Sequence, residues 1–275
     1  MRLKIFHVTT YAYDPPPSGV IQVLRLTPGN HDGQYVADWH VDVSVDARLH
    51  MQHDAFSNVT HVFSHGPLSE LTVHVSGLVE TQDTGGVLKG TIERFPPGFF
   101  LRATALTGAC AEMADLSRRL LADAGGDTLD FLHALLAQLG ARLTFDASAA
   151  ADAGAASATE AFKHKRGGCQ DHAHIFAACA RAAGVPARFV SGHFYSADGK
   201  QSREGHAWAE AFVPQLGWVG FDPVNGVCTT DAHARVAVGL DYLGAAPVRG
   251  TYFGGGGETL SVAVKIDQAG RQSQN

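Results

Sequence analysis

The chain has 275 residues, of which 45% are hydrophobic and 17% are charged, and its net charge is −6. This composition is typical of a globular protein with a sizeable core, and the length allows one large domain or two ordinary ones. The negative charge, without any cluster of Lys or Arg, argues against nucleic acid or an anionic membrane as the main partner.

The N-terminal segment, residues 1–8, has no apolar run followed by a small-residue cleavage site, so we do not expect a signal peptide. No apolar stretch approaches the ~20 residues that span a bilayer. We therefore expect a cytoplasmic protein. Its four cysteines, Cys110, Cys169, Cys179 and Cys228, are then expected to be thiols rather than a disulfide framework.

Residues 1 to about 103 show the alternation of apolar and polar side chains that is typical of half-buried strands. Turn residues, mainly Pro, Gly and Asn, separate the candidate strands. Several short strands with regular turns indicate an antiparallel sandwich or open barrel. The clearest predicted strands cover residues 21–26, 38–45, 58–63 and 71–79.

The second part of the chain changes character. Apolar residues at helical spacing predict helices over 110–122 and 128–139, separated by Gly125 and Gly126. A further helical stripe begins at Cys169 and is stopped by Gly184 and Pro186. Predicted strands follow at 188–194, 207–213, 218–222 and 260–266.

These patterns predict an α+β protein with two domains. Residues 1–103 are assigned to an N-terminal β domain and residues 104–275 to a second domain, with its core motifs within 162–226. The segments 147–158 and 195–204 are predicted to be loops that line a cleft.

The strongest functional signal is a set of three residues at the ends of these elements. Cys169 follows two glycines and opens a helix, His206 opens a strand, and Asp222 closes the next strand. A thiol, an imidazole that accepts its proton and a carboxylate that orients the imidazole are the parts of a nucleophilic triad. The unpaired N–H groups at the helix start favour a thiolate and can stabilise an oxyanion.

A simple hairpin would bring two of the three together. If the turn between the two strands is centred on Pro214, His206 lies opposite Asp222, and opposed residues point to the same face of a sheet. A bulge would shift this register by one residue.

Other interpretations of these residues are open. A lone helical Cys is more often part of the core than catalytic, and we expect this for Cys179, with structural roles for Cys110 and Cys228. Cys169, His172 and His174 are close enough in sequence to raise a zinc site, but a structural zinc needs a second ligand cluster, which is missing. We expect no metal and no cofactor.

The motifs resemble the transglutaminase-like superfamily, in particular its bacterial proteins with an N-terminal β region. The resemblance is carried by residues 166–174 around Cys169, by 184–192, by 206–210 and by 217–226. It extends to residues 24–28, 54–58 and 79–81, and to 241–250 near the C-terminus. It implies a β-sandwich-like domain followed by a papain-like core, in which the helix carrying Cys packs on an antiparallel sheet.

Two departures from the family pattern concern the backbone. Ser57 stands where a Gly is common before an Asn, which affects a turn. Gly168 stands where a Val is frequent, which could loosen the backbone beside Cys169. Neither removes a catalytic group.

The resemblance implies acyl transfer through a thioester, with Cys169 as nucleophile, His206 as general base and acid, and Asp222 as the residue that holds the imidazole. Water would make the protein a peptidase or amidase, the option we favour, and an amine would make it a transglutaminase. A non-catalytic binding or scaffold module is the third option. The expected partner is a peptide or protein substrate, and Trp208 and Trp218 are candidates to wall the cleft.

Overall fold

The computed structural model describes residues 1–147, 156–197 and 205–270. The predicted cleft loops, 147–158 and 195–204, fall largely outside these ranges. In the part that is described, no helix combines the length and the hydropathy needed to cross a bilayer. The cytoplasmic location stays a prediction.

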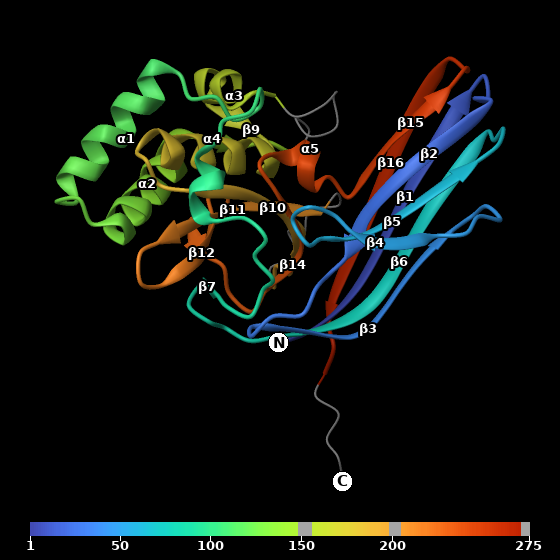
Figure 1. The fold of residues 1–275 in the computed structure, drawn as a ribbon, viewed down its shortest axis with the longest axis horizontal. Helices are drawn as coiled ribbons and strands as arrows, with labels where there is room; N and C mark the ends of the chain where they lie inside the picture. Colours follow the sequence, from blue (N-terminus) through green and yellow to red (C-terminus); the bar gives the residue numbers. More distant parts are fainter. Residues whose placement is uncertain (148–155, 198–204, 271–275) are drawn as a thin grey trace, which may run out of the picture.

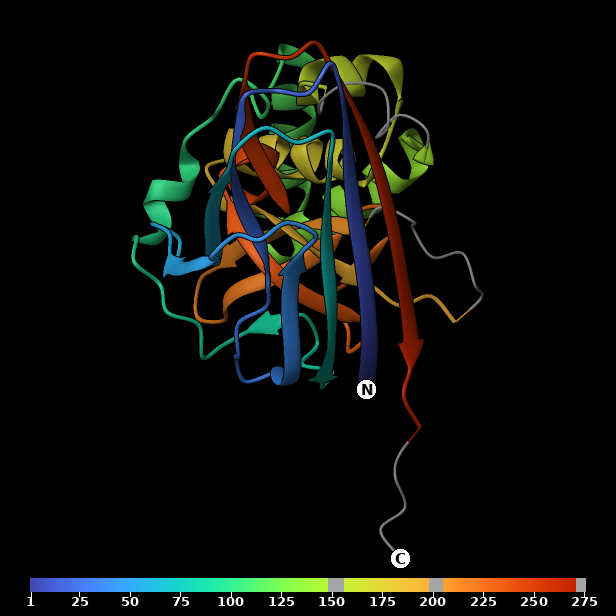
Figure 2. The same ribbon diagram turned by 90° about the vertical axis from the view of Figure 1, so that its right-hand side faces the viewer.

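Two antiparallel sheets form a sandwich, as the alternation predicted (Figures 1 and 2). One sheet has the strand order β16-β1-β6-β3 and the other β15-β2-β5-β4. Their inward residues form the core, because alternate side chains of each strand are buried. The strands are β1 (Arg2–Asp14), β2 (Gly19–Thr27), β3 (Gln34–Val43), β4 (His50–His53), β5 (Val59–His65), β6 (Glu70–Thr81), β15 (Val248–Phe253) and β16 (Gly257–Gln268).

The remaining elements build a mixed layer of helices on a sheet of order β13-β12-β11-β10-β14, with β7 added beside β12. Helix α4 packs on the sheet and is covered by the other helices, so almost all of its residues are buried. The elements are β7 (Val87–Leu88), η1 (Pro97–Leu101), α1 (Ala111–Asp123), α2 (Thr128–Arg142), β8 (Thr144–Phe145), α3 (Ala158–His164), β9 (Arg166–Gly167), α4 (Cys169–Ala182), β10 (Ala187–Phe194), β11 (His206–Val213), β12 (Gly217–Asp222), β13 (Val227–Cys228), β14 (His233–Gly239) and α5 (Tyr242–Ala245).

Strands from each predicted domain pair with sheets of the other, so the predicted domain boundary at residue 103 does not separate the sandwich from the second sheet. Strand β16 pairs with β1 along its full length, from Leu3 opposite Gln268 to Asp14 opposite Gly257. Strand β15 pairs with β2 in the second sheet of the sandwich. Conversely, β7 from the first part joins the sheet that carries α4. The last two strands therefore belong to the sandwich and not to the second layer (Figure 1).

Two side-chain amides fix the sandwich to the edge of the second layer. Asn58 exchanges hydrogen bonds with the backbone of Val238, at 2.8 Å for both. Gln34 does the same with the backbone of Arg235, at 2.7 and 2.8 Å. Strand β14 is at the edge of its sheet, so its outer N–H and C=O groups have no neighbouring strand to pair with in the described part of the chain. Each amide hydrogen-bonds one such N–H and one such C=O.

Candidate active site

Cys169 is the first residue of α4, as predicted. Gly167 lets the helix start close to the preceding strand, since a Cβ on it would lie 2.6 Å from the Asp171 side chain. The Asp171 carboxylate accepts a hydrogen bond from the Gly168 N–H at 2.9 Å and so caps the helix start. Gly168 has φ −75°, which a Val could also adopt.

His206 and Asp222 are brought together, but not by the register predicted. Val213 pairs with Gly217 and Ala209 pairs with Phe221, so the hairpin turns about Gln215 instead of Pro214. The residue opposite Asp222 would then be Trp208, and His206 is its diagonal neighbour two positions away. Because the shift is even, both side chains keep the same face, and His206 Nε2 donates to Asp222 Oδ2 at 2.7 Å.

Asp222 is fully buried and accepts hydrogen bonds on both oxygens. Its Oδ1 accepts from the backbone N–H of Val224 at 3.0 Å and of Asn225 at 3.2 Å. Its Oδ2 accepts from the Asn225 side chain at 2.6 Å, from His206 and from His233. This set of donors fixes the carboxylate in position and favours its charged form.

His233 is a second imidazole on the same carboxylate, and sequence reasoning missed it. Its Nδ1 accepts from the Thr230 N–H at 3.0 Å, which fixes the ring proton on Nε2. That Nε2–H donates to Asp222 Oδ2 at 3.1 Å. No sequence motif surrounds His233. Its strand, β14, comes near Asp222 through the pairing of β14 with β10, which local sequence does not reveal.

The charged forms of His206 and Asp222 stabilise each other. Burial alone would lower the pKa of His206, but the charge and hydrogen bond of Asp222 outweigh it, and the hydrogen bond to Cys169 adds to them, so that the pKa rises to about 10. Burial opposes ionisation of Asp222, yet His206 and His233 hold the pKa of that carboxyl well below its usual range. The imidazolium form of His206 is therefore favoured beside the Cys169 sulfur.

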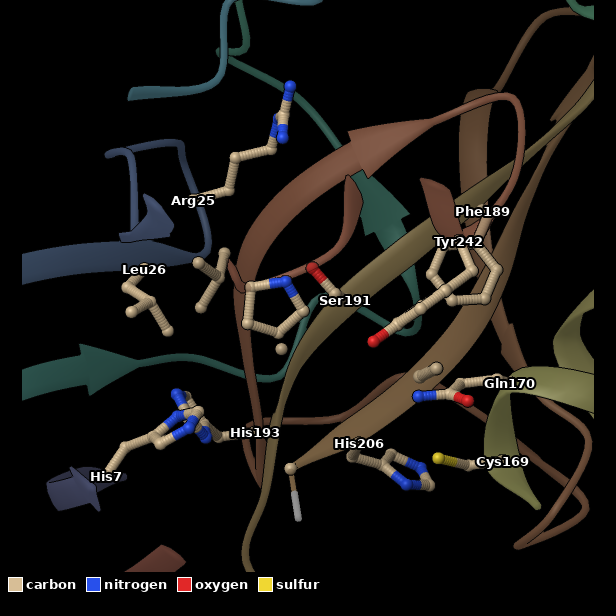
Figure 3. Close-up of a pocket in the computed structure, with 15 residues that line it drawn as sticks. His7, Arg25, Leu26, Cys169, Gln170, Phe189, Ser191, His193, His206 and Tyr242 are labelled. Atoms are coloured by element: carbon tan, nitrogen blue, oxygen red, sulfur yellow. The ribbon is translucent and has the colours of Figure 1, made fainter. Parts of the chain in front are cut away.

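Figure 3 shows the Cys169 sulfur directed at the His206 ring. Because Nε2 of His206 is engaged by Asp222, Nδ1 is the nitrogen left for the thiol. Cys169 and His206 are both 9% exposed and line a small hollow of about 30 Å³. Side chains of the sandwich, His7 and Leu26 among them, form its other wall (Figure 3).

Trp208 was predicted to wall the cleft, and that role stays a prediction. It is 2% exposed and does not line the hollow that contains Cys169. Its ring packs edge-on against His233, with centroids 5.3 Å apart, and lies under Gly192. In the described residues, Trp208 thus packs against His233. Trp218, 5% exposed, is likewise buried, against the guanidinium of Arg188.

Two family models match the chain. Residues 114–223 match the core of the transglutaminase-like superfamily, and residues 3–80 match the bacterial transglutaminase-like N-terminal region. The uncharacterized protein ML0607 of Mycobacterium leprae is 30% identical over 281 residues, which cover 96% of this chain and 98% of that protein. The chain belongs to the transglutaminase-like superfamily.

Further likenesses agree with this assignment. The uncharacterized protein Mb2599c of Mycobacterium bovis is 35% identical over 99 residues, 32% of each chain. A crystal structure from Cytophaga hutchinsonii, whose assignment as a cysteine protease is provisional, superimposes with a TM-score of 0.74. The match covers 97% of this chain and 90% of that one at 16% identity, so it shows a shared fold. The predicted family and the α+β fold class are both confirmed.

Of the four cysteines of this transglutaminase-like protein, Cys169 alone is among the described residues that line the hollow. Cys179 is in the core on α4, and burial raises the pKa of its thiol to about 12. Burial also raises the pKa of Cys228. Cys110 is the residue that precedes α1. None of the three has an imidazole partner among the hydrogen bonds of the described residues.

The histidines near Cys169 are engaged in other contacts. His172 Nδ1 donates to the Gly168 carbonyl at 2.8 Å, and His174 Nε2 accepts from the Tyr242 N–H at 2.9 Å. Ligand atoms of His206, Asp222 and His233 do lie within 4.8 Å of one another, as a metal would require. However, His233 Nε2 carries its proton, and a metal ligand must present a bare nitrogen. Hydrogen bonding, rather than ligation, accounts for this cluster.

Proposed function

We propose that this protein is a cysteine hydrolase that cleaves amide or peptide bonds through a thioester, with Cys169, His206 and Asp222 as its catalytic triad. The observation that carries the proposal is the continuous chain from the Cys169 sulfur through the His206 ring to the buried Asp222 carboxylate. A module that only binds would have no need to bury a charged pair beside a helix-terminal thiol.

In the acylation step, the Cys169 sulfur attacks the carbonyl carbon of the substrate. The carbonyl oxygen gains negative charge, and the unpaired N–H groups at the start of α4 would stabilise it. The C–N bond then breaks, and the proton on His206 passes to the leaving nitrogen. The product is an acyl group joined to Cys169 as a thioester, and a free amine.

In the second step, a water molecule gives a proton to His206 and its oxygen attacks the thioester carbon. The C–S bond breaks, the sulfur leaves as a thiolate, and the carboxylic acid is released. Asp222 keeps its charge throughout, and its role is to hold the imidazole and to stabilise the imidazolium. An amine in place of water would give a transglutaminase. The provisional assignment of the Cytophaga hutchinsonii protein to the cysteine proteases supports water as the acceptor.

Incubation with a mixture of peptides, with and without a fluorescent primary amine, tests the proposal. Mass spectrometry separates the outcomes, because hydrolysis yields cleaved or deamidated peptides and amine transfer yields the fluorescent adduct. We expect hydrolysis by the wild type and none by Cys169→Ala, with Cys110→Ala as the matched control that keeps activity. Equal product from wild type and Cys169→Ala, or adduct in excess of hydrolysis, would contradict the proposal.

A further inference from the structure

The hollow beside Cys169 lies between the sandwich and the second sheet, and two buried histidines line it (Figure 3). His7 comes from β1 and is 2% exposed, and His193 comes from β10 and is 3% exposed. Their ring centroids are 5.6 Å apart. Within the residues that the structure describes, the buried Nδ1 of each ring has no hydrogen-bond partner. A buried nitrogen without a partner is costly, so the two rings together indicate a ligand.

His7 interrupts the buried stripe of its strand where the strand passes the hollow. The inward side chains before it, Leu3 and Ile5, pack in one apolar cluster, and Tyr11, beyond it, packs in another. Between them lie His7 and Thr9, joined by a hydrogen bond of 3.0 Å between His7 Nε2 and Thr9 Oγ1. An apolar residue at position 7 would serve the sandwich better if packing were the only requirement, so the histidine indicates a polar role at the hollow.

The size of the hollow limits what the two rings can bind. Its volume is about 30 Å³, and a water molecule needs roughly 10–15 Å³ of such space. The hollow therefore has room for about two water molecules, whereas a side chain of several carbon atoms does not fit.

The polarity of the hollow fits the same ligand. Burial lowers the pKa of His7 to about 4, and burial together with the nearby His7 and His206 lowers that of His193 to about 3, so both rings are neutral near pH 7. A neutral imidazole offers one N–H donor and one bare acceptor, and an ordered buried water needs about two to four polar partners. The described residues that line the hollow include no carboxylate to pair with a cation. The guanidinium of Arg25, also in the wall, donates from Nε to Asp54 at 3.0 Å.

The hollow also reaches the triad. Cys169 and His206 line it together with His7 and His193, and Figure 3 shows the two pairs on different sides of it. The ring of His206 is close enough to contribute to the lowered pKa of His193. A water molecule in the hollow would therefore lie beside the sulfur that carries the acyl group and beside the general base.

We propose that this hollow is the site of the hydrolytic water, which His7 and His193 hold beside Cys169 and His206. The inference rests on the proposed function and deepens it, because it assigns the acceptor that breaks the thioester. The water gives one proton to His206, and its other hydrogen is bonded to the bare nitrogen of a neutral ring. Its oxygen bonds to the thioester carbon, the C–S bond breaks, and the sulfur leaves as a thiolate. A lysine side chain is too large for the hollow, which favours water over an amine acceptor.

Kinetics with p-nitrophenyl acetate measure acylation and deacylation separately. The burst of p-nitrophenolate reports acylation of Cys169, and the steady rate that follows reports deacylation by water. We expect His7→Phe and His193→Phe each to lower the steady rate about tenfold, because each removes a polar partner of the water, and to leave the burst rate within about twofold of the wild type. A wild-type steady rate in both variants, or an equal fall of burst and steady rate, would overturn the proposal.

Partition of the acyl-enzyme gives a second measure, which does not depend on the slow step. With N-acetyl-lysine amide as a competing amine, the ratio of acetylated amine to acetate, corrected for the Cys169→Ala background, should rise about tenfold in each Phe variant. His193→Asn restores a donor and an acceptor near Nδ1 and should return the ratio toward that of the wild type. His61→Phe is the matched control, because the Nδ1 of His61 is also buried and unpartnered among the described residues but lies outside the hollow. An unchanged ratio in both Phe variants would contradict the water site.

A crystal structure separates this inference from the proposed function. The wild type should show ordered water within about 3.2 Å of Nδ1 of His7 and of His193, and the two Phe variants should lose it. Such water together with an inert Cys169 would leave the water site and remove the hydrolase. A reactive Cys169 beside a dry hollow would leave the hydrolase and overturn the inference.

Discussion

At the scale of single residues, Asp222 organises the site. It is fully buried, accepts hydrogen bonds from two backbone N–H groups and three side chains, and so has its charge and orientation fixed before substrate arrives. Two of the donors are imidazoles with different tasks. His206 is hydrogen-bonded to Cys169 as well as to Asp222, whereas His233 is hydrogen-bonded to Asp222 and Thr230.

His233→Phe should lower kcat about tenfold with little change in KM, because it removes one hydrogen bond from the carboxylate that orients His206 but no contact with substrate. His233→Gln keeps an N–H donor and should recover most of the loss, as followed by steady-state kinetics. If the Gln variant is as impaired as the Phe variant, His233 acts through packing alone.

The ion pair between His206 and Asp222 predicts a dependence of stability on pH. The folded pKa of His206, about 10, lies above its ordinary value of about 6.5, so its contribution is full below pH 6.5 and is lost as the pH rises toward 10. Urea unfolding should therefore show the wild type losing stability relative to His206→Gln across this window. If the unfolding free energies of wild type and His206→Gln change in parallel between pH 6.5 and 10, the predicted contribution of the ion pair is wrong.

At the scale of elements, a buried ionic network stiffens the strands that carry the site. Arg188 on β10 is 1% exposed and pairs with Glu210 on β11 at 2.7 Å and with Glu93 at 2.7 Å. Arg235 on β14 pairs with the same Glu210 at 2.7 Å. Neighbouring strands are thus tied on the same face as His206, and the segment that carries Glu93 is tied to them.

Arg188→Met should lower the free energy of unfolding by about 3–5 kcal/mol, because it removes one partner of a buried ion pair and leaves Glu210 partly uncompensated. Chemical denaturation measures the loss. Arg118→Met is the control, since Arg118 pairs with Asp115 on the exposed surface of α1, and the change there should be at most about 1 kcal/mol. If the two variants lose similar amounts of unfolding free energy, the buried ion pairs do not stabilise the fold more than an exposed one.

The elements near the site were predictable because their signals are local. The helix that begins at Cys169, its end at Gly184 and the strands of the hairpin all follow from periodicity, glycine and proline. The register of that hairpin was not predictable. Gln215 in its turn adopts a left-handed conformation with φ 71°, which a glutamine does not favour. Ser57, with φ 64°, likewise takes a conformation that favours the glycine common at that position.

At the scale of the whole molecule, the sandwich and the second sheet each contain strands from both halves of the chain. Chain order suggested a cut near residue 103, yet β15 and β16 return to the sandwich and β7 crosses to the other sheet. Such pairings depend on contacts between residues far apart in sequence, which periodicity does not reveal. For the same reason, neither the hollow between the sandwich and the second sheet nor the contact of His7 with His193 could be predicted from the sequence.

The buried histidines predict weakness toward acid. Burial lowers the folded pKa of His7 and of His174 to about 4, and that of His193 to about 3, so these rings take up protons between pH 6.5 and 4 only when the chain unfolds. Each should cost about 1.4 kcal/mol of stability per pH unit over that range. His193→Phe should show a shallower decline between pH 6.5 and 5 in urea unfolding, and an unchanged slope would contradict this.

The central claim is that Cys169 is a nucleophile activated by His206. The most direct test is iodoacetamide labelling as a function of pH, resolved for each cysteine by peptide mass spectrometry, on wild type and His206→Ala. We predict that Cys169 labels far faster than Cys110, Cys179 and Cys228 near neutral pH, and that His206→Ala removes this advantage. Labelling of Cys169 that is no faster than that of the other three, and that is indifferent to His206, would contradict the account.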